Sequence, residues 1–446
     1  MPPPAPRSYE GGDPSPERPS MLRRLFLAPL LALAACATPT TPRDSMDAIA
    51  TDYVKMTLAL GEREEGYVDA YYGPPEWQAA AKLDTRTAAQ LGAEARRLSA
   101  RLAALPSATG LEARRRAFMQ GQLTAAETRV RMMGGAKLPF AEEAQGLFAV
   151  RPDIKPLSAY DPVLARIDRL VPGPGPLSDR VDAFQNRFTI PKDRLDPVFR
   201  AAIAECRRRT VARIPLPADE KFTLEFVTGK SWSGYNYYKG AYTSLIQVNT
   251  DLPIRISRAV DLGCHEGYPG HHAYNLLLER ELARKRGWIE FTVNPLYSPQ
   301  SIISEGSANY GIELAFPGPE KLAFETRVLY PLAGLPTADA ARYDALLTAL
   351  QDLGGARFTI ARDYLEGRLT KPQAVAMTQR YQLVSAARAA QSISFTDQYR
   401  SYVINYGLGL DMVRAHVERG GADPAVRWTR MEQLLSEPTL PSDLSR

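Results

Sequence analysis

Cysteine and histidine are scarce in this chain, which has three cysteines and four histidines in 446 residues. So few cysteines cannot form the dense disulfide framework of small secreted domains, and a chain of this length can bury a core without one. Basic residues do not cluster into a stripe, although the formal net charge is +5, so nucleic-acid binding is not expected. The 45% of hydrophobic and 24% of charged residues are typical of a soluble globular protein.

Long apolar runs are lacking too, and the segment that comes closest to one lies near the N-terminus. Arg23 and Arg24 precede a short, mostly apolar stretch that ends in Leu-Ala-Ala followed by Cys36. A charged start and a short apolar stretch are typical of a secretory signal, and the stretch is too short to cross a bilayer. Its end resembles a bacterial lipoprotein cleavage site, so we predict that Cys36 carries lipid.

This pattern predicts how the N-terminal segment is divided. Translation is expected to start at Met21, which makes residues 1–20 an error in the assigned gene start. Residues 21–35 are then the signal peptide, and residues 36–44 a short tether. Ala37, in place of Asp, favours the outer membrane facing the periplasm, by resemblance to bacterial sorting patterns. The lipid is the only expected contact with a membrane; an ordinary secreted protein cleaved elsewhere is the alternative.

The remaining residues, 45–446, are predicted to form a single domain with a mainly α-helical pattern. Residues 88–105 and 111–133 are dense in Ala, Leu, Arg and Glu with few helix breakers. Residues 196–214 and 320–417 have the same character. The fold class is therefore expected to be mainly α.

One part of the chain has the character of strands. Residues 221–227 and 244–250 predict a small antiparallel β-sheet. The second segment precedes the histidine-rich region, and it is either an edge strand that could hold an extended peptide or a core strand. Residues 171–176, Val-Pro-Gly-Pro-Gly-Pro, indicate a loop between helices or a domain boundary.

Three of the four histidines are clustered. His265, His271 and His272 lie within eight residues, and Glu266 follows the first of them. Neutral imidazole is a common zinc ligand, and a carboxylate beside it can act on a bound water. In the familiar His-Glu-x-x-His pattern, the spacing of four residues places both imidazoles on one face of a helix. Here the second histidine follows after six or seven residues, so a straight helix is not expected to place both imidazoles on one zinc ion.

The helix geometry explains why. Six steps leave two side chains about 120° apart, and seven steps separate them by about 10 Å along the axis, too far to share one zinc ion. The helix is therefore predicted to break. Pro269 removes a backbone donor and disfavours the helical conformation of the residue before it, and Gly270 permits unusual dihedral angles. A break could bring His271 back towards His265, with His272 as the other possible partner.

The run at residues 265–272, His-Glu-Gly-Tyr-Pro-Gly-His-His, resembles the signature of the bacterial domain-of-unknown-function 885 family, which is grouped with zinc metallopeptidases. More distantly it resembles the helical zincins of the angiotensin-converting-enzyme, oligopeptidase and carboxypeptidase Taq types, whose His-Glu-x-Gly-His is two residues shorter. The resemblance implies a helical zincin-like metallopeptidase fold. It also makes His271 the second zinc ligand, with His272 as the alternative.

The same resemblance implies a third ligand and an oxyanion donor. Glu305 begins a run similar to the Glu-Gly-x-Ala-x-Tyr of the family and is the expected third ligand, with Glu313 as the competitor. Late tyrosines stabilise the oxyanion in the helical zincins. Tyr406, in Tyr-Gly-Leu-Gly, resembles the family's Tyr-x-x-Gly segment and is the expected donor. Tyr402 is the alternative, and His416 is a weaker one.

Together these residues predict a zinc-dependent hydrolase, most of all a metallopeptidase. Zn²⁺ is expected on His265, His271 and Glu305, while Glu266 takes a proton from the zinc-bound water and hands it to the leaving amine. The substrate is then a peptide or a small amide. The alternatives are a zinc hydrolase of non-peptide amides or esters, or a non-catalytic surface lipoprotein on the same fold.

Two further cysteines follow Cys36 in the chain. Cys264 directly precedes His265, but adjacent residues on a helix point about 100° apart. This favours a buried small residue over a fourth metal ligand. The sequence leaves open whether Cys206 pairs with Cys264, and it does not indicate an oligomeric state.

Overall fold

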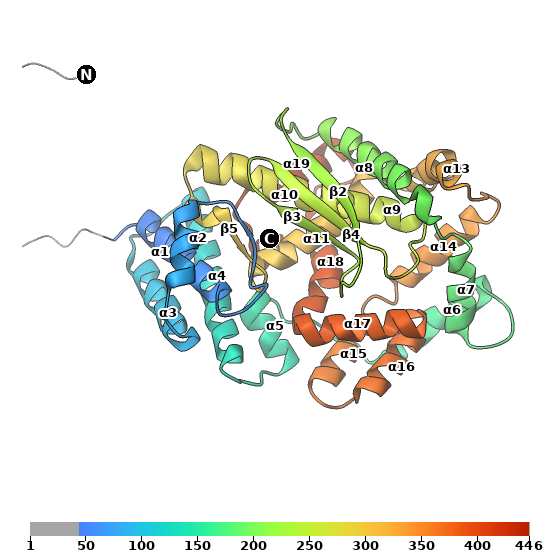
Figure 1. Ribbon diagram of the computed structural model, residues 1–446, viewed down its shortest axis with the longest axis horizontal. Helices are drawn as coiled ribbons and strands as arrows, with labels where there is room; N and C mark the ends of the chain where they lie inside the picture. Colours follow the sequence, from blue (N-terminus) through green and yellow to red (C-terminus); the bar gives the residue numbers. More distant parts are fainter. Residues whose placement is uncertain (1–43, 446) are drawn as a thin grey trace, which may run out of the picture. The chain divides into compact units, whose positions relative to one another are not determined.

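The computed structural model describes residues 44–445, in which α-helices greatly outnumber β-strands (Figure 1). The predicted mainly α fold class is thus confirmed. The predicted signal peptide and Cys36 lie outside the described residues. Within the described part, no helix combines the length and the apolar character needed to cross a membrane.

The N-terminal part of the described chain is helical. Its elements are α1 (Met46–Gly61), β1 (Val68–Tyr71), α2 (Pro75–Leu83), α3 (Ala88–Ala104), α4 (Gly110–Met133) and α5 (Phe140–Phe148). Helix α3 shows why these segments fold as they do, because Thr87 and Gln90 form a capping box at its N-terminus. Its apolar residues recur at helical spacing and form one buried face, which consists of Leu91, Ala95, Leu98 and Leu102.

The next elements lead to the sheet. They are η1 (Leu157–Tyr160), α6 (Asp161–Leu170), α7 (Leu177–Asn186), η2 (Lys192–Arg194) and α8 (Leu195–Val211). The proline- and glycine-rich residues 171–176 form the connection between α6 and α7. Cys206 on α8 is buried and forms a disulfide bond with Cys264. Cys264 is therefore buried, as expected, and its sulfur is not free to bind a metal.

The principal sheet has the strand order β2-β4-β3, with β2 (Lys221–Val227), β3 (Gly234–Tyr238) and β4 (Thr243–Asn249). β3 is antiparallel to β4, whereas β2 runs parallel to β4. The sheet is thus mixed rather than purely antiparallel, because β3 returns the chain between the two segments that the sequence identified. β4 is the central strand, so residues 244–250 form a core strand, and β2 and β3 are the two edges. A second, two-stranded sheet pairs β1 with β5 (Val293–Pro295).

The histidine-rich segment is a broken helix. It consists of α9 (Ser257–Leu262), the π-helical turn η3 (Gly263–Gly267), α10 (His271–Leu278) and the π-helical turn η4 (Glu279–Arg284). The predicted break is present, since Tyr268 has extended backbone angles (φ −134°, ψ 122°). Only glycine fits at position 270, because a Cβ there would overlap the backbone carbonyl of His265.

Helices dominate again to the C-terminus. They are η5 (Ile289–Thr292), α11 (Pro299–Ala315), α12 (Glu320–Phe324), η6 (Glu325–Leu329), α13 (Tyr330–Ala333), α14 (Ala340–Gln351), α15 (Ala356–Leu365), α16 (Lys371–Gln382), α17 (Ala386–Tyr399), η7 (Arg400–Val403), α18 (Ile404–Glu418), α19 (Pro424–Ser436) and α20 (Pro441–Leu444). Helices α11 and α18 lie against each other in the middle of this part of the molecule (Figure 1).

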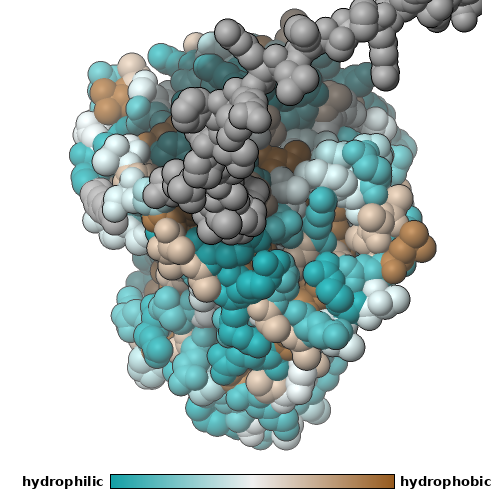
Figure 2. All heavy atoms as spheres, turned by 90° about the vertical axis from the view of Figure 1, so that its left-hand side faces the viewer, coloured by the Kyte–Doolittle hydropathy of each residue, from teal (hydrophilic) through white to brown (hydrophobic). Residues whose placement is uncertain are grey.

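The buried apolar residues form two clusters. The first joins the N-terminal helices to α18 and α19, and the second joins α6 to α8, the principal sheet and α14 to α16. α10 and α11 contribute to both, so the broken helix and its neighbour lie where the two clusters meet. On the described part of the face in Figure 2, hydrophilic side chains predominate and hydrophobic ones are scattered.

Candidate metal centre

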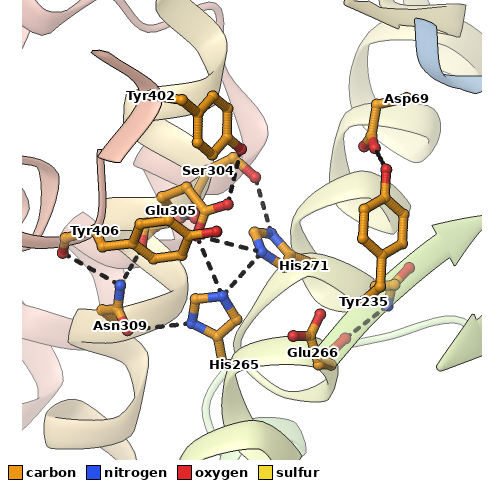
Figure 3. A network of polar contacts seen from close by, with 12 residues as sticks. Asp69, Tyr235, His265, Glu266, His271, Ser304, Glu305, Asn309, Tyr402 and Tyr406 are labelled. Atoms are coloured by element: carbon orange, nitrogen blue, oxygen red, sulfur yellow. Dashed lines mark hydrogen bonds and ion pairs between the residues drawn. The ribbon is translucent and has the colours of Figure 1, made fainter. Parts of the chain in front are cut away.

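Three of the residues singled out in the sequence converge on one point (Figure 3). His265 comes from η3, His271 is the first residue of α10, and Glu305 lies on α11. The two Nε2 atoms are 3.1 Å apart, and Glu305 Oε2 lies 3.2 Å from the first and 3.8 Å from the second. The break before α10 is what returns His271 to the side of His265.

These separations fit a single metal ion. A tetrahedral ion with bonds of about 2.1 Å holds its ligand atoms about 3.4 Å apart. Glu305 Oε2 is buried and has no hydrogen-bond partner, which is costly unless a cation occupies the space in front of it. Burial lowers the pKa of His271 to about 4, so its imidazole is neutral and able to bind a metal near pH 7. The three residues therefore form a group that could hold a metal ion.

Asn309 orients the first imidazole. Its amide nitrogen donates to the backbone oxygens of Glu305 (3.0 Å) and Tyr406 (3.3 Å), which leaves its Oδ1 facing His265 Nδ1 at 3.2 Å. His265 Nδ1 must then carry the proton and donate it to Asn309. The lone pair of Nε2 is consequently directed at the other two ligand atoms, as metal binding requires.

The other two ligands are held in a similar way. His271 Nδ1 lies 2.9 Å from Ser304 Oγ, and Tyr402 donates its hydroxyl to Glu305 Oε1 at 2.8 Å. Tyr402, the alternative oxyanion donor, is therefore engaged by a ligand. Burial opposes ionisation of Glu305, but the nearby imidazoles of His271 and His265 and the hydroxyl of Tyr402 lower its pKa overall, so the carboxylate is the stable form.

Glu266 lies beside this group but does not belong to it. Its side chain is buried, its Oε2 has no hydrogen-bond partner, and burial raises its pKa to about 7. Its backbone oxygen accepts a hydrogen bond from Asn236 on β3 (2.6 Å). Gly234 on the same strand makes room for the carboxylate, because a Cβ there would lie 2.8 Å from Glu266 Oε1. The edge strand thus packs directly against the candidate base.

Tyr406 faces the same space with a free hydroxyl. Its ring stacks on that of His265, with centroids 6.3 Å apart and an angle of 19° between the planes. Among the described residues, none forms a hydrogen bond with the hydroxyl of Tyr406, and burial raises its pKa well above the usual value, so it keeps its proton. A neutral hydroxyl without a partner can donate to an oxygen that enters the site.

Three candidates lie away from the group. His272 is fully buried, with Nδ1 2.8 Å from Ser244 Oγ and Nε2 2.9 Å from Glu220, so both of its nitrogens are engaged elsewhere. Glu313 forms an ion pair of 2.6 Å with Arg414. His416 lies on α18 between arginines, and burial lowers its pKa. None of the three belongs to the ligand group, although Glu313 lines the adjacent cavity.

The sequence missed Asp69, the partner of Tyr235. The hydroxyl of Tyr235 on β3 donates to the carboxylate of Asp69 on β1, close to the metal group (Figure 3). Burial and the nearby Glu305 raise the pKa of Asp69 to about 7. No motif marks Asp69, which precedes the histidines by almost 200 residues. Asn309 could have been suspected, because it stands four residues after Glu305 on the same face of the helix, whereas no such spacing marks Ser304.

A cavity of about 750 Å³ opens next to the group. His265, Glu266 and Tyr406 lie in its wall, together with residues of α14, α15 and α17. The site is thus accessible from a space that could hold several residues of a substrate.

No protein-family model and no curated protein matches this sequence. Among solved structures, the chain is similar to a candidate lipoprotein from Colwellia psychrerythraea, at 14% identity and a TM-score of 0.48. That likeness covers 79% of this chain and 63% of the other, so the chain spans less than two thirds of its length. It is also similar to the M32 carboxypeptidase from Deinococcus radiodurans R1, at 14% identity and a TM-score of 0.34, over 87% and 88% of the two chains.

Likenesses of this strength do not assign an activity. The membership of the domain-of-unknown-function 885 family stays a prediction from the motifs. The function has to be inferred from the site itself.

Proposed function

We propose that this protein is a zinc-dependent hydrolase that cleaves peptide bonds. The observation that carries the proposal is the convergence of two imidazole nitrogens and one carboxylate oxygen, at the spacing of a single ion, beside the unpartnered carboxylate of Glu266. Two histidines, a glutamate and an open position are a donor set of catalytic zinc sites. Zinc, when bound there, would polarise a carbonyl group and make water more acidic.

The residues around the ligands supply the proton chemistry. Glu266 accepts a proton from the attacking water and returns it to the leaving amine, which requires a carboxylate oxygen that no other group engages. Tyr406 donates its hydroxyl to the oxygen of the tetrahedral intermediate. Tyr402 and Asn309 take no part in proton transfer and hold Glu305 and His265 in place.

The edge strand favours peptides over other amides. β3 pairs with β4 on one side, and no described strand pairs with its other edge. An extended peptide could form main-chain hydrogen bonds along such an edge, which would bring a scissile bond towards Glu266. Hydrolysis of non-peptide amides or esters by the same residues is the second candidate, since the chemistry at the carbonyl is shared.

The test combines zinc content with turnover of a peptide library by the purified protein. The wild-type protein is expected to hold stoichiometric zinc and to cleave peptides. Glu266→Gln is expected to keep the zinc and to lose turnover by at least about a hundredfold, because an amide cannot accept the proton. Glu313→Gln is the matched control, since Glu313 pairs with Arg414 outside the ligand group.

Each outcome decides between the candidates. Undiminished turnover by Glu266→Gln would sink the mechanism. A folded protein without zinc would favour a non-catalytic lipoprotein. Cleavage of small amides or esters, but not of peptides, in the same assay would favour the second candidate.

A further inference from the structure

The cavity beside the metal group contains cationic side chains that differ in their partners. Arg258 and Lys321 lie 3.6 Å and 2.8 Å from the carboxylate oxygens of Asp261, and Arg427 lies 3.1 Å from Glu418. Two other arginines of the cavity wall form no ion pair with any described residue. These are Arg357 at the start of α15 and Arg388 at the start of α17.

Arg357 is the one nearer to the candidate catalytic residues. Its guanidinium carbon lies 5.7 Å from the ring centroid of Tyr406 and 5.1 Å from that of Phe395. Its Nε is buried and has no hydrogen-bond partner. Burial lowers the pKa of this guanidinium, although Tyr406 and Glu305 act in the opposite direction. A half-buried guanidinium with a buried, unpartnered Nε and no ion pair is costly, so a purely structural role does not explain Arg357.

Arg388, the second of these arginines, also lacks a carboxylate partner. Its guanidinium donates to the backbone oxygen of Pro253 at 2.5 Å and meets no carboxylate. Burial, together with the neighbouring Arg255 and Arg258, lowers its pKa to about 10. An anion in this part of the cavity would relieve both the desolvation and the repulsion between the arginines.

We propose that Arg357 binds the terminal carboxylate of the substrate, so that the enzyme acts on peptides next to their free C-terminus. This inference rests on the proposed function. Arginine suits the task because its planar group binds a carboxylate through two parallel hydrogen bonds.

The distances agree with a site close to the chain end. The ring of Tyr406 neighbours both groups, 6.3 Å from the ring of His265 and 5.7 Å from the guanidinium carbon of Arg357, so these two groups are at most about 12 Å apart. One or two extended residues, at about 3.3 to 3.6 Å each, together with an ion pair of about 3 Å, span a gap of this size. A long polypeptide that continued past the scissile bond would leave Arg357 without a carboxylate.

The experiment compares N-acetylated tripeptides as free acids, as C-terminal amides, and as amides with Asp or Glu in the last position. The wild-type protein is expected to cleave the acids with a kcat/KM about ten- to a hundredfold above the amides. Arg357→Gln should remove this preference by raising KM for the acids. The kcat/KM for the amides and the zinc content should not change. Arg414→Gln, on the same helix as Tyr406 and paired with Glu313, should keep the preference.

Several results would overturn the inference. These are equal cleavage of acids and amides by the wild-type protein, an equal loss for both in Arg357→Gln, or a preference for the amides with acidic side chains. If the wild-type protein cleaves no peptide, the proposed function fails. Calorimetry of the tripeptide acids then decides the inference separately, because binding to the wild-type protein but not to Arg357→Gln would still support the carboxylate site, and binding to neither would overturn it.

Discussion

Single residues hold the metal group through hydrogen bonds that come from outside the three ligands. Asn309, Ser304 and Tyr402 each engage the atom of a ligand that faces away from the shared point. Such partners fix the orientation of the ligands before a metal arrives, so less ordering remains to be done on binding. Their contribution to metal affinity can be measured without changing a ligand.

Tyr402→Phe removes the hydroxyl that donates to Glu305 and keeps the aromatic ring. We expect zinc affinity to fall by at least about tenfold, because the carboxylate loses a bond that holds it towards the metal. Competition with a chromogenic chelator measures the effect. The control is Tyr364→Phe, whose hydroxyl bonds to Asp397 at the surface. An unchanged affinity in Tyr402→Phe would contradict the positioning role.

Two helices bring the ligand and the tyrosines together. α11 carries Glu305, and α18 carries Tyr406, directly after the short η7 that contains Tyr402. The backbones of α11 and α18 approach closely at Gly306 and Gly409, since a Cβ on the first would overlap the backbone of the second. This approach sets the distance between the two sides of the site, because no side chain separates the helices there.

Gly306→Ala should therefore damage both the fold and the site. The added methyl group must push α18 away, and we expect the free energy of unfolding to fall by about 1 to 3 kcal/mol. The zinc content should fall with it, because Tyr402 moves away from Glu305. Urea unfolding and metal analysis check the two effects. Gly134→Ala is the control, since its Cβ would meet nothing closer than 3.4 Å; equal stability of the two variants would argue against the close approach.

At the scale of the whole molecule, one covalent bond and one sequence pattern bear on the compartment of the protein. The disulfide between Cys206 and Cys264 joins α8 to the broken helix that carries two candidate metal ligands, and such bonds persist mainly in oxidising compartments. The predicted signal and the lipid on Cys36 lie outside the described residues and rest on the sequence pattern. The two features agree with a place in the cell envelope.

Cys36→Ser tests the proposed anchor. The wild-type protein is expected in the membrane fraction of bacterial cells, and the variant should lose lipid attachment and no longer enter that fraction as a mature lipoprotein. Mass spectrometry of the mature N-terminus and cell fractionation measure this. Ala37→Asp serves as the matched control, because it keeps the cysteine and should change only the membrane in which the protein resides. A mature N-terminus elsewhere than at Cys36 would contradict the lipoprotein prediction.

Local patterns in the sequence determined a large part of the result. Helical composition predicted the mainly α fold, because helix formation depends on residues three and four apart. The break at Tyr268 followed from Pro269 and Gly270, which act on their own backbone. The sequence also singled out His265 and Glu266, since a cluster of a rare residue type, histidine, beside a carboxylate can be recognised from the order of residues alone.

Only the tertiary structure decided which residues meet. His271 rather than His272 lies beside His265, because the path of the chain through the break depends on packing against α11 and the sheet. The mixed pairing of the sheet and the places of Asp69 and Arg357 could not be read from any motif. These arrangements join segments far apart in the chain, and a contact of that kind is fixed by how helices and strands pack, not by the residues adjacent in sequence.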